Sequence, residues 1–345
     1  PTLLEEERPG YVHAEVLFRA MALLEDAGAE CIFPGPGSLY RSLTGKTWVP
    51  KLAEAQVRSH FAMPATVSVR REDVTSGGWL KGAAKVLDEL RQHRQGRKPR
   101  GEPEEIVVKL GYSWESRDVR FCAPEPLALS LVLAKLFSRG SHDCCIVQEV
   151  VDVRCEMRYH VLNGRVQDVR PTRFPQRCSN CASPSCFQRL PQNLDSVAQC
   201  CFDGDIGFLR AVDERCRELI CRLLAWLQRE HTDFGCPPYL RFDFLVGDGG
   251  ASCDSAPASA QRVAERARSA VWTGEVGELG SSMCGWEDGR NYVFEAALVK
   301  FFRRCSAECR REIGCCCHFA TESFDLLVRP PSGQEAWLQQ DVFEA

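Results

Sequence analysis

The chain has 345 residues, of which 44% are hydrophobic and 26% charged, and its formal net charge is −4. This composition is ordinary for a globular protein and leaves room for two domains or one large composite domain. The mildly negative charge gives no basic field for nucleic acid, and no apolar run is long enough to cross a bilayer. We therefore expect neither nucleic-acid nor membrane partners.

The chain is cysteine-rich, with 20 cysteines. Many are direct neighbours, such as Cys144-Cys145 and Cys200-Cys201, an arrangement that suits orderly disulfide pairing poorly. Cys216 and Cys221 occupy apolar positions of a predicted helix, where cysteine acts as a small core residue. A chain of this length can fold on its core alone, so we expect a reducing, cytoplasmic compartment.

In the first half of the chain, amphipathic helices alternate with short strands. Apolar spacing predicts a helix over residues 11–30, and a short strand follows at 31–37. The polar stretches 94–104 and 111–116 are expected to be loops. Further helices are predicted over 51–61, 78–93 and 125–138, and strands over 65–69, 106–109, 146–151 and 156–162.

The second half begins with Asn163-Gly164, which predicts a tight hairpin. A polar, irregular stretch follows at 177–192. Residues 208–228 carry the apolar stripe of a long helix. Strands over 239–246 and 270–276 enclose a Gly-, Ala- and Ser-rich insertion (247–268) whose second half is expected to be helical, and a last helix covers 292–305. Helices mixed with hairpin-connected strands indicate an α+β fold rather than a doubly wound parallel sheet.

Four separated segments each place a polar side chain inside or at the end of an apolar, β-branched run. This pattern is typical of a strand that delivers one functional group into a cleft. The polar residues, in chain order, are Lys109, Glu149, Asp243 and Glu275. Their order suggests contacts to the phosphates, adenine and magnesium of a nucleoside triphosphate.

The first two segments would serve the nucleotide itself. Lys109 is a compact charge suited to phosphate oxygens, although a lysine at a strand end usually faces solvent. The loop after it contains Ser113 and offers backbone N–H groups. Backbone groups of 149–151 would face an adenine edge, and Glu156 would accept hydrogen bonds from the ribose. The alternative is an edge strand with solvated glutamates.

The last two segments would serve a cation. Alternation places Arg241 and Asp243 on one face of a strand, which costs desolvation unless they pair or bind ions. Glu275 ends a second strand. Two carboxylates on neighbouring strands suit magnesium, which prefers hard oxygen ligands. The alternative is an ordinary cross-strand pair of arginine and carboxylate.

With these residues in order, the region from about Lys46 to Phe302 resembles the ATP-grasp superfamily, to which D-alanine–D-alanine ligase belongs. The resemblance implies two α+β lobes that hold ATP in a cleft between antiparallel sheets. The ATP-grasp domain would cover 46–330, with a small lobe at about 60–150 and a large lobe at about 151–330. Residues 1–45 would be the remnant of a preceding α/β domain, and 331–345 a C-terminal tail.

The resemblance also implies roles for individual residues, with ATP and Mg²⁺ as cofactors. Lys46 would contact the phosphates, with Lys51 as the alternative. The other implied ATP-binding residues are Lys109, Ser113, Gln148, Glu149, Val150, Val151 and Glu156. Arg241, with Arg170 or Arg173, would be catalytic, and Asp243 and Glu275 would bind metal. Gly277 stands where the family usually has an asparagine, so Glu278 is the substitute metal ligand.

The implied activity is an ATP- and Mg²⁺-dependent ligase that joins a carboxylate to an amine or thiol through an acylphosphate. The substrates would be small molecules or peptides. Two alternatives remain open: a nucleotide-binding protein without ligase activity, and a kinase that uses the same cleft.

Two cysteine clusters suggest a different kind of site. Cys178-x-x-Cys181 with Cys186 and Cys200 has spacing compatible with zinc, although a surface loop rich in cysteine is the blander interpretation. Cys315-Cys316-Cys317-His318 fits a metal less well, because consecutive residues of a strand point to opposite faces.

Overall fold

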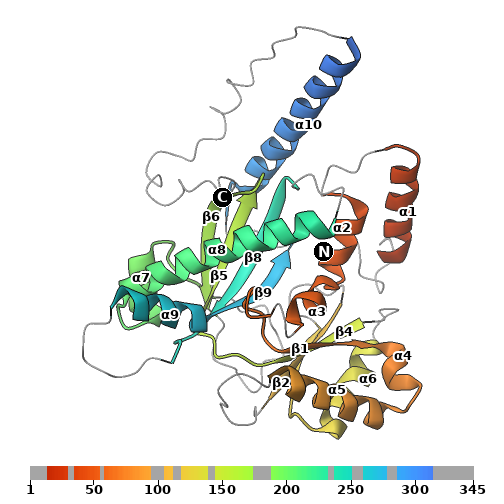
Figure 1. The fold of residues 1–345 in the computed structure, drawn as a ribbon, viewed down its shortest axis with the longest axis vertical. Coiled ribbons are helices and arrows are strands. Elements are labelled where there is room, and N and C mark those ends of the chain that lie inside the picture. Colours follow the sequence, from red (N-terminus) through yellow and green to blue (C-terminus); the bar gives the residue numbers. More distant parts are fainter. Residues whose placement is uncertain are drawn as a thin grey trace.

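The computed structural model of the chain describes residues 14–29, 35–54, 58–94, 105–111, 118–138, 144–173, 188–231, 237–250, 259–277 and 286–313. Two antiparallel sheets organise these residues into two lobes (Figure 1). The small lobe has the strand order β1-β4-β2-β3, and the large lobe has β7-β6-β5-β8-β9. The predicted α+β fold with two antiparallel sheets is confirmed.

The small-lobe sheet consists of β1 (Thr66–Arg70), β2 (Ile106–Leu110), β3 (Val119–Cys122) and β4 (Cys144–Glu149). Helices α4 (Arg71–Thr75), α5 (Trp79–Arg94) and α6 (Pro126–Phe137) accompany it. Val67, Val108 and Val147 point toward these helices and are buried in one cluster with Leu87 and Leu133. Because side chains alternate along a strand, Thr66, Lys109 and Gln148 lie on the opposite face.

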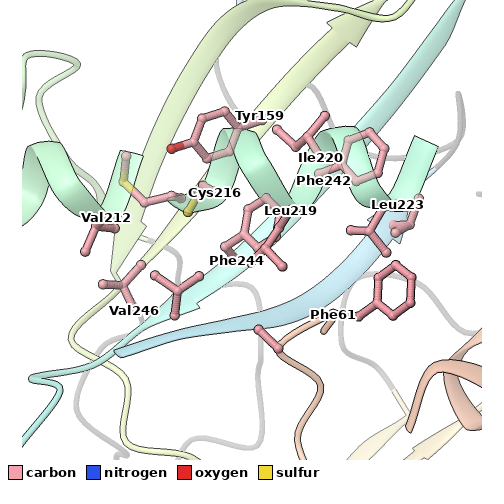
Figure 2. Close-up of a cluster of buried hydrophobic side chains, with 14 of the residues drawn as sticks. Phe61, Tyr159, Val212, Cys216, Leu219, Ile220, Leu223, Phe242, Phe244 and Val246 are labelled. Carbon is pink, nitrogen blue, oxygen red and sulfur yellow. The ribbon is translucent and has the colours of Figure 1, made fainter. Parts of the chain in front are cut away.

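The large-lobe sheet contains β5 (Cys155–Leu162), β6 (Arg165–Arg173), β7 (Gln188–Arg189), β8 (Tyr239–Val246) and β9 (Val271–Gly277). Helices α7 (Leu194–Cys201), α8 (Ile206–Glu230) and α9 (Ala260–Ala270) belong to the same lobe. The apolar stripe of α8, including Val212, Leu219 and Leu223, packs against Phe242 and Phe244 of β8 (Figure 2). This main core leaves the other face of the sheet to polar residues.

The remaining helices are α1 (Ala14–Asp26), α2 (Gly37–Thr44), α3 (Trp48–Ala53) and α10 (Gly289–Ile313). The α10 helix extends away from the large lobe (Figure 1), and its start packs on Leu162 and Tyr239 through Val293 and Ala296. Among the described helices, none combines the length and the hydropathy that a bilayer span requires.

Most predicted helices and strands are present, with shifted ends. The hairpin is confirmed, since Asn163 and Gly164 have φ of 48° and 81° and join paired strands. The helix expected over 51–61 is wrong: α3 begins at Trp48, with Pro50 in its first turn, and ends at Ala53, and 58–62 form turns. The strand expected over 146–151 ends at Glu149.

Several elements had not been predicted, namely α2, α4, α7, β3 and the two-residue β7. Some predictions fall outside the described residues. These are the first part of the strand at 31–37, nearly all of the loops at 94–104 and 111–116, most of 177–192, and Cys315 to His318.

Candidate functional site

Three adjacent strands of the large sheet each carry a carboxylate paired with the arginine two residues away. Residues at this spacing share one face of a strand, so the pairs form a charged surface opposite α8. Strand register places Arg158 between Arg170 and Asp243 across the sheet. The pairs are Glu156–Arg158 on β5, Asp168–Arg170 on β6 and Arg241–Asp243 on β8.

The pair on β8 is bidentate and buried. Arg241 Nε donates to Asp243 Oδ1 at 2.8 Å, and Nη2 donates to Oδ2 at 2.6 Å. Burial lowers the pKa of Arg241, but Asp243 and Glu275 raise it, and the net shift is well upward. Arg241 is therefore a permanent cation within this face.

Glu156 is held in place by two neighbours. Its Oε2 accepts hydrogen bonds from Arg158 Nε at 2.7 Å and from Thr172 Oγ1 at 3.1 Å. The pKa of Glu156 is raised. Burial is the largest cause and Asp243 adds to the shift, while Arg158 and Arg241 oppose it. The carboxylate is thus fixed on the charged face by β5 and β6.

A β-bulge brings Glu275 to the same face. Asp243 pairs with Glu275, but the next residue, Phe244, pairs with Thr273, so Gly274 is an extra residue in β9. A Cβ on Gly274 would lie 3.1 Å from the Asp243 carbonyl oxygen, which explains why glycine fits there. The extra residue lets Thr273 be buried while Glu275 stands beside Asp243.

Glu275 also meets two cations. Its Oε1 lies 3.5 Å from Lys46 Nζ, and its Oε2 lies 3.7 Å from Arg241 Nη2. Burial raises the pKa of Glu275, but Lys46, Arg241 and Lys109 outweigh it, so the pKa is lowered. The Glu275 side chain is 41% exposed, whereas Lys46 is only 13% exposed. Glu275 therefore remains ionised and reachable from solvent.

Lys109 approaches from the small lobe. Gln148 Oε1 accepts a hydrogen bond from Lys109 Nζ at 3.0 Å, and Gln148 Nε2 donates to Thr66 Oγ1 at 2.8 Å. The pKa of Lys109 is lowered, chiefly by burial and further by Lys46, while Glu275 and Glu156 oppose the shift. The charges of Glu275 and Glu156 in the large lobe thus act on Lys109 in the small lobe.

The side chain of Glu149 has two protein partners. Its Oε1 accepts a hydrogen bond from Ala65 N at 2.7 Å, and its Oε2 lies 3.3 Å from Arg94 Nε. The side chain thus ties the end of β4 to the residue before β1. Val150 and Val151 follow the last pair of the β4 ladder, so their backbone groups lie outside the sheet.

The sequence left two choices open, between Lys46 and Lys51 and between Arg170 and Arg173, and in each choice the two residues have different surroundings in the structure. Lys51 is bonded to Glu230 at 2.6 Å on the surface, whereas Lys46 is at Glu275. Arg170 shares the charged face with Arg158, but Arg173 is an odd number of residues further along β6 and lies on the helix-covered face. Its charge accordingly acts on Cys201 of α7. Ser113 and Glu278 lie outside the described residues.

His160 is a member of this face that sequence reasoning missed. It is fully buried, shares a 2.9 Å hydrogen bond with Tyr239 through Nδ1, and has a tilted Trp286 ring 5.0 Å away. No described residue bonds its Nε2. Burial lowers the pKa of His160 to about 3, assisted by the nearby arginines. The alternation Glu156-x-Arg158-x-His160 was the available signal.

Among the described residues, the candidate metal ligands are two neighbouring carboxylates. Within the described ranges, no three His, Cys, Asp or Glu side chains gather around one point. Cys200 is exposed, and Cys178, Cys181 and Cys186 lie outside those ranges, so the zinc site stays a prediction. Asp243 and Glu275 supply hard oxygen atoms on neighbouring strands, which suits magnesium completed by phosphate and water.

A surface depression of about 610 Å³ lies elsewhere, between α5 and α6. It is apolar, and Leu80, Ala84 and Leu127 are among its lining residues. These helices cover the face of the small sheet opposite Lys109, so the depression is separate from the charged site.

No protein-family model matches the chain, and no curated protein matches its sequence. Among solved structures, a D-cycloserine synthetase is 16% identical with a TM-score of 0.48, covering 82% of this chain and 78% of that one. D-alanine–D-alanine ligase from Bacillus anthracis is 13% identical with a TM-score of 0.47, covering 84% and 76%. D-alanyl-alanine synthetase A from Vibrio cholerae is 11% identical with a TM-score of 0.44, covering 82% and 72%. Likenesses this distant leave the chemistry to be argued from the residues of this chain.

Proposed function

We propose that this protein is an ATP- and Mg²⁺-dependent ligase of the ATP-grasp type, which joins a carboxylate to an amine or thiol. One observation carries the proposal. Lys46 Nζ lies 3.5 Å from Glu275, and the charge of Glu275 also acts on Lys109, which is far from Lys46 in the sequence and comes from the small lobe. Cations from two lobes around a carboxylate pair form the arrangement that a triphosphate and its metal require.

The two lysines are the proposed phosphate contacts. Lys109 is positioned by Gln148, which is itself fixed by Thr66, so little ordering is left for the bound state. Charged hydrogen bonds of this kind each contribute about 1.5–3 kcal/mol. Ser113, in the loop after β2, stays a proposed phosphate contact on sequence spacing alone.

Magnesium fits the carboxylate pair. Each oxygen of Asp243 has two lone pairs, so Asp243 can bind a cation without releasing Arg241. Glu275 is half-exposed on the ligand side, and Glu278 is the proposed further ligand. The ion, when bound, offsets the charge of the phosphate oxygens.

The nucleoside would lie along the junction of β4 and β5. We assign the adenine edge to backbone groups of Val150 and Val151, which have left the sheet ladder, and the ribose to Glu156. Glu149 supports this junction through Ala65 and Arg94 instead of facing the base.

For the chemical step, Arg241 and Arg170 would stabilise the charge that develops as a substrate carboxylate attacks the γ-phosphorus in line. The acylphosphate would then be captured by an amine or thiol. This chemistry needs no side-chain nucleophile, because positioning and charge stabilisation supply most of the rate.

A second candidate function is nucleotide binding without ligation. Gly277 pairs with Arg241 in register, two residues beyond Glu275, and contributes no side-chain oxygen to the metal. A loss of one ligand at this position would weaken turnover more than binding.

The proposal is tested by titrating Mg-ATP calorimetrically and by following ADP release with mixed carboxylate and amine acceptors. We expect binding, and ADP release that depends on the acceptors. The Lys109→Met variant should bind Mg-ATP about tenfold more weakly or worse. Lys135→Met, which removes an exposed lysine of α6, is the matched control.

Absence of Mg-ATP binding by the unmodified chain would reject both candidate functions. Binding without acceptor-dependent ADP release would favour the second. ADP release only with hydroxyl acceptors would indicate a kinase.

A further inference from the structure

The small lobe has an apolar outer surface formed by α5 and α6. The two helices pack against each other on the face of the small sheet opposite Lys109, at the end of the molecule that lies away from α10 (Figure 1). The depression of about 610 Å³ lies between them, with Leu80 and Ala84 on one side and Leu127 on the other. This surface is therefore separate from the proposed ATP site.

Helix α6 is apolar on both of its faces. Of its residues (Pro126–Phe137), only Ser130 and Lys135 are polar. One side of the helix is buried against the small sheet, but Leu127 and Leu131 on the other side are 62% and 64% exposed. A helix at the surface normally carries polar residues on its outer face, whereas a helix that is apolar all round is covered on both sides. The composition of α6 thus indicates that its outer face has a partner.

The exposed leucines form a ridge beside the depression. Residues four apart share one face of a helix, so Leu127 and Leu131 make a row along α6, and Leu80 and Ala84 make a second row along α5. Leu80 is 55% exposed. Two helix surfaces pack when the rows of one fit into the grooves of the other. A single copy of this chain carries both the apolar ridge and the apolar groove that such packing requires.

The charges beside the depression are balanced. Lys81 of α5 and Glu125, the residue before α6, both line it and are both exposed. In the part of the chain that the structure describes, neither forms an ion pair, and Glu125 makes no side-chain capping hydrogen bond. A complementary partner must offer one anion and one cation. A second copy turned about a twofold axis does so, because Lys81 of each copy then faces Glu125 of the other.

We propose that this surface, formed by Leu80, Lys81, Glu125, Leu127 and Leu131, is a dimer interface with a second copy of the chain. The leucine ridge of each copy packs into the groove between α5 and α6 of the other, and two Lys81–Glu125 pairs flank the contact. Three leucines and two charges per subunit make a small interface, which predicts a weak, reversible dimer with a micromolar dissociation constant. The inference goes beyond the proposed ligase function and does not depend on it.

The test measures sedimentation velocity of the purified full chain at concentrations from about 1 to about 100 µM. We expect the mean mass to rise from monomer toward dimer over this range. Leu131→Ser should weaken the dimer about tenfold or more, because both subunits lose a buried apolar side chain. Leu23→Ser is the matched control and should leave the dimer unchanged, since Leu23 of α1 is 62% exposed but lies outside the surface.

A charge reversal tests the twofold arrangement. Lys81→Glu and Glu125→Lys should each weaken self-association about tenfold, because like charges then face each other at both flanks of the contact. An equimolar mixture of the two variants should dimerise like the unmodified chain, since opposite charges meet at both flanks of the mixed dimer. This rescue would also show that both variants are folded.

Three results would overturn the proposal. A chain that stays monomeric over the whole range would leave the surface to another occupant, such as a different protein or another segment of this chain. A dimer that is unaffected by Leu131→Ser would use a different face. A mixture of the charge variants that fails to restore the dimer would exclude the twofold pairing of Lys81 with Glu125.

Discussion

Arg241 holds both carboxylate oxygens of Asp243 from two residues away on the same strand, and neither side chain is more than 6% exposed. The carboxylate that we assign to magnesium is therefore already fixed by a guanidinium of the protein. A buried pair of this kind contributes position more than stability, because both groups lose their water.

The first prediction concerns the stability of this pair. Asp243→Asn leaves a buried arginine without its charged partner and should reduce the free energy of unfolding by about 3–5 kcal/mol. The double variant Arg241→Met/Asp243→Leu removes both charges and should recover much of that loss. Urea denaturation of the three proteins measures the difference. A double variant less stable than Asp243→Asn would contradict this account.

The second prediction separates two lysines. Lys46→Met should weaken Mg-ATP binding by about tenfold or more, because a charged contact to phosphate is lost. Lys51→Met should leave affinity unchanged, because Lys51 is engaged with Glu230 on the surface. Calorimetric titration of both variants provides the comparison. Equal affinities would remove Lys46 from the proposed site.

The third prediction concerns Glu275. Its half-exposed side chain can be neutralised with little change in folding, so Glu275→Gln should melt close to the unmodified protein. ADP release should nevertheless be lost, or should require much more magnesium. Asp248→Asn is the control, since Asp248 is paired with Arg154 at the surface. An unchanged magnesium dependence of Glu275→Gln would count against the metal assignment.

The fourth prediction concerns acid stability. The pKa of His160 falls from 6.5 to about 3 on folding, chiefly through burial. Between these values the unfolded chain binds a proton that the folded chain does not, so stability should decrease as the pH falls through this window. The slope for one such group is up to about 1.4 kcal/mol per pH unit.

Unfolding free energies measured across this pH range test the prediction. The His160→Gln variant keeps a polar partner for Tyr239. Its unfolding free energy should depend less steeply on pH, by up to about 1.4 kcal/mol per pH unit. An identical pH dependence in both proteins would show that His160 is protonated in the folded state.

Periodicity was sufficient to predict much of the fold and part of the site. The alternation around Arg241 and Asp243 identified their shared face, and the Asn163-Gly164 turn identified the hairpin. The same alternation is present in β5, but only Glu156 was taken from it, and Arg158 and His160 were overlooked.

Other features depend on contacts between distant segments. Lys46 has a φ of 56°, and its side chain reaches Glu275. Local spacing in the sequence indicates neither the backbone conformation nor the contact. The side-chain partners of Glu149, which are Ala65 and Arg94, come from distant segments and are not indicated by local spacing. The choice between Arg170 and Arg173 required the pairing register of β5 and β6. The short, poorly buried strand β3 gave no apolar pattern to detect.

The single inserted residue at Gly274 affects how this chain must be aligned with others. Strict alternation from the buried Thr273 would place Glu275 on the helix-covered face, whereas the bulge places it on the charged face. A related chain without the insertion would need its acidic residue one position earlier to occupy the same point in space. Deletion of this one glycine would leave a regular strand with the carboxylate still opposite Asp243, whereas duplication would turn the carboxylate toward the hydrophobic helices.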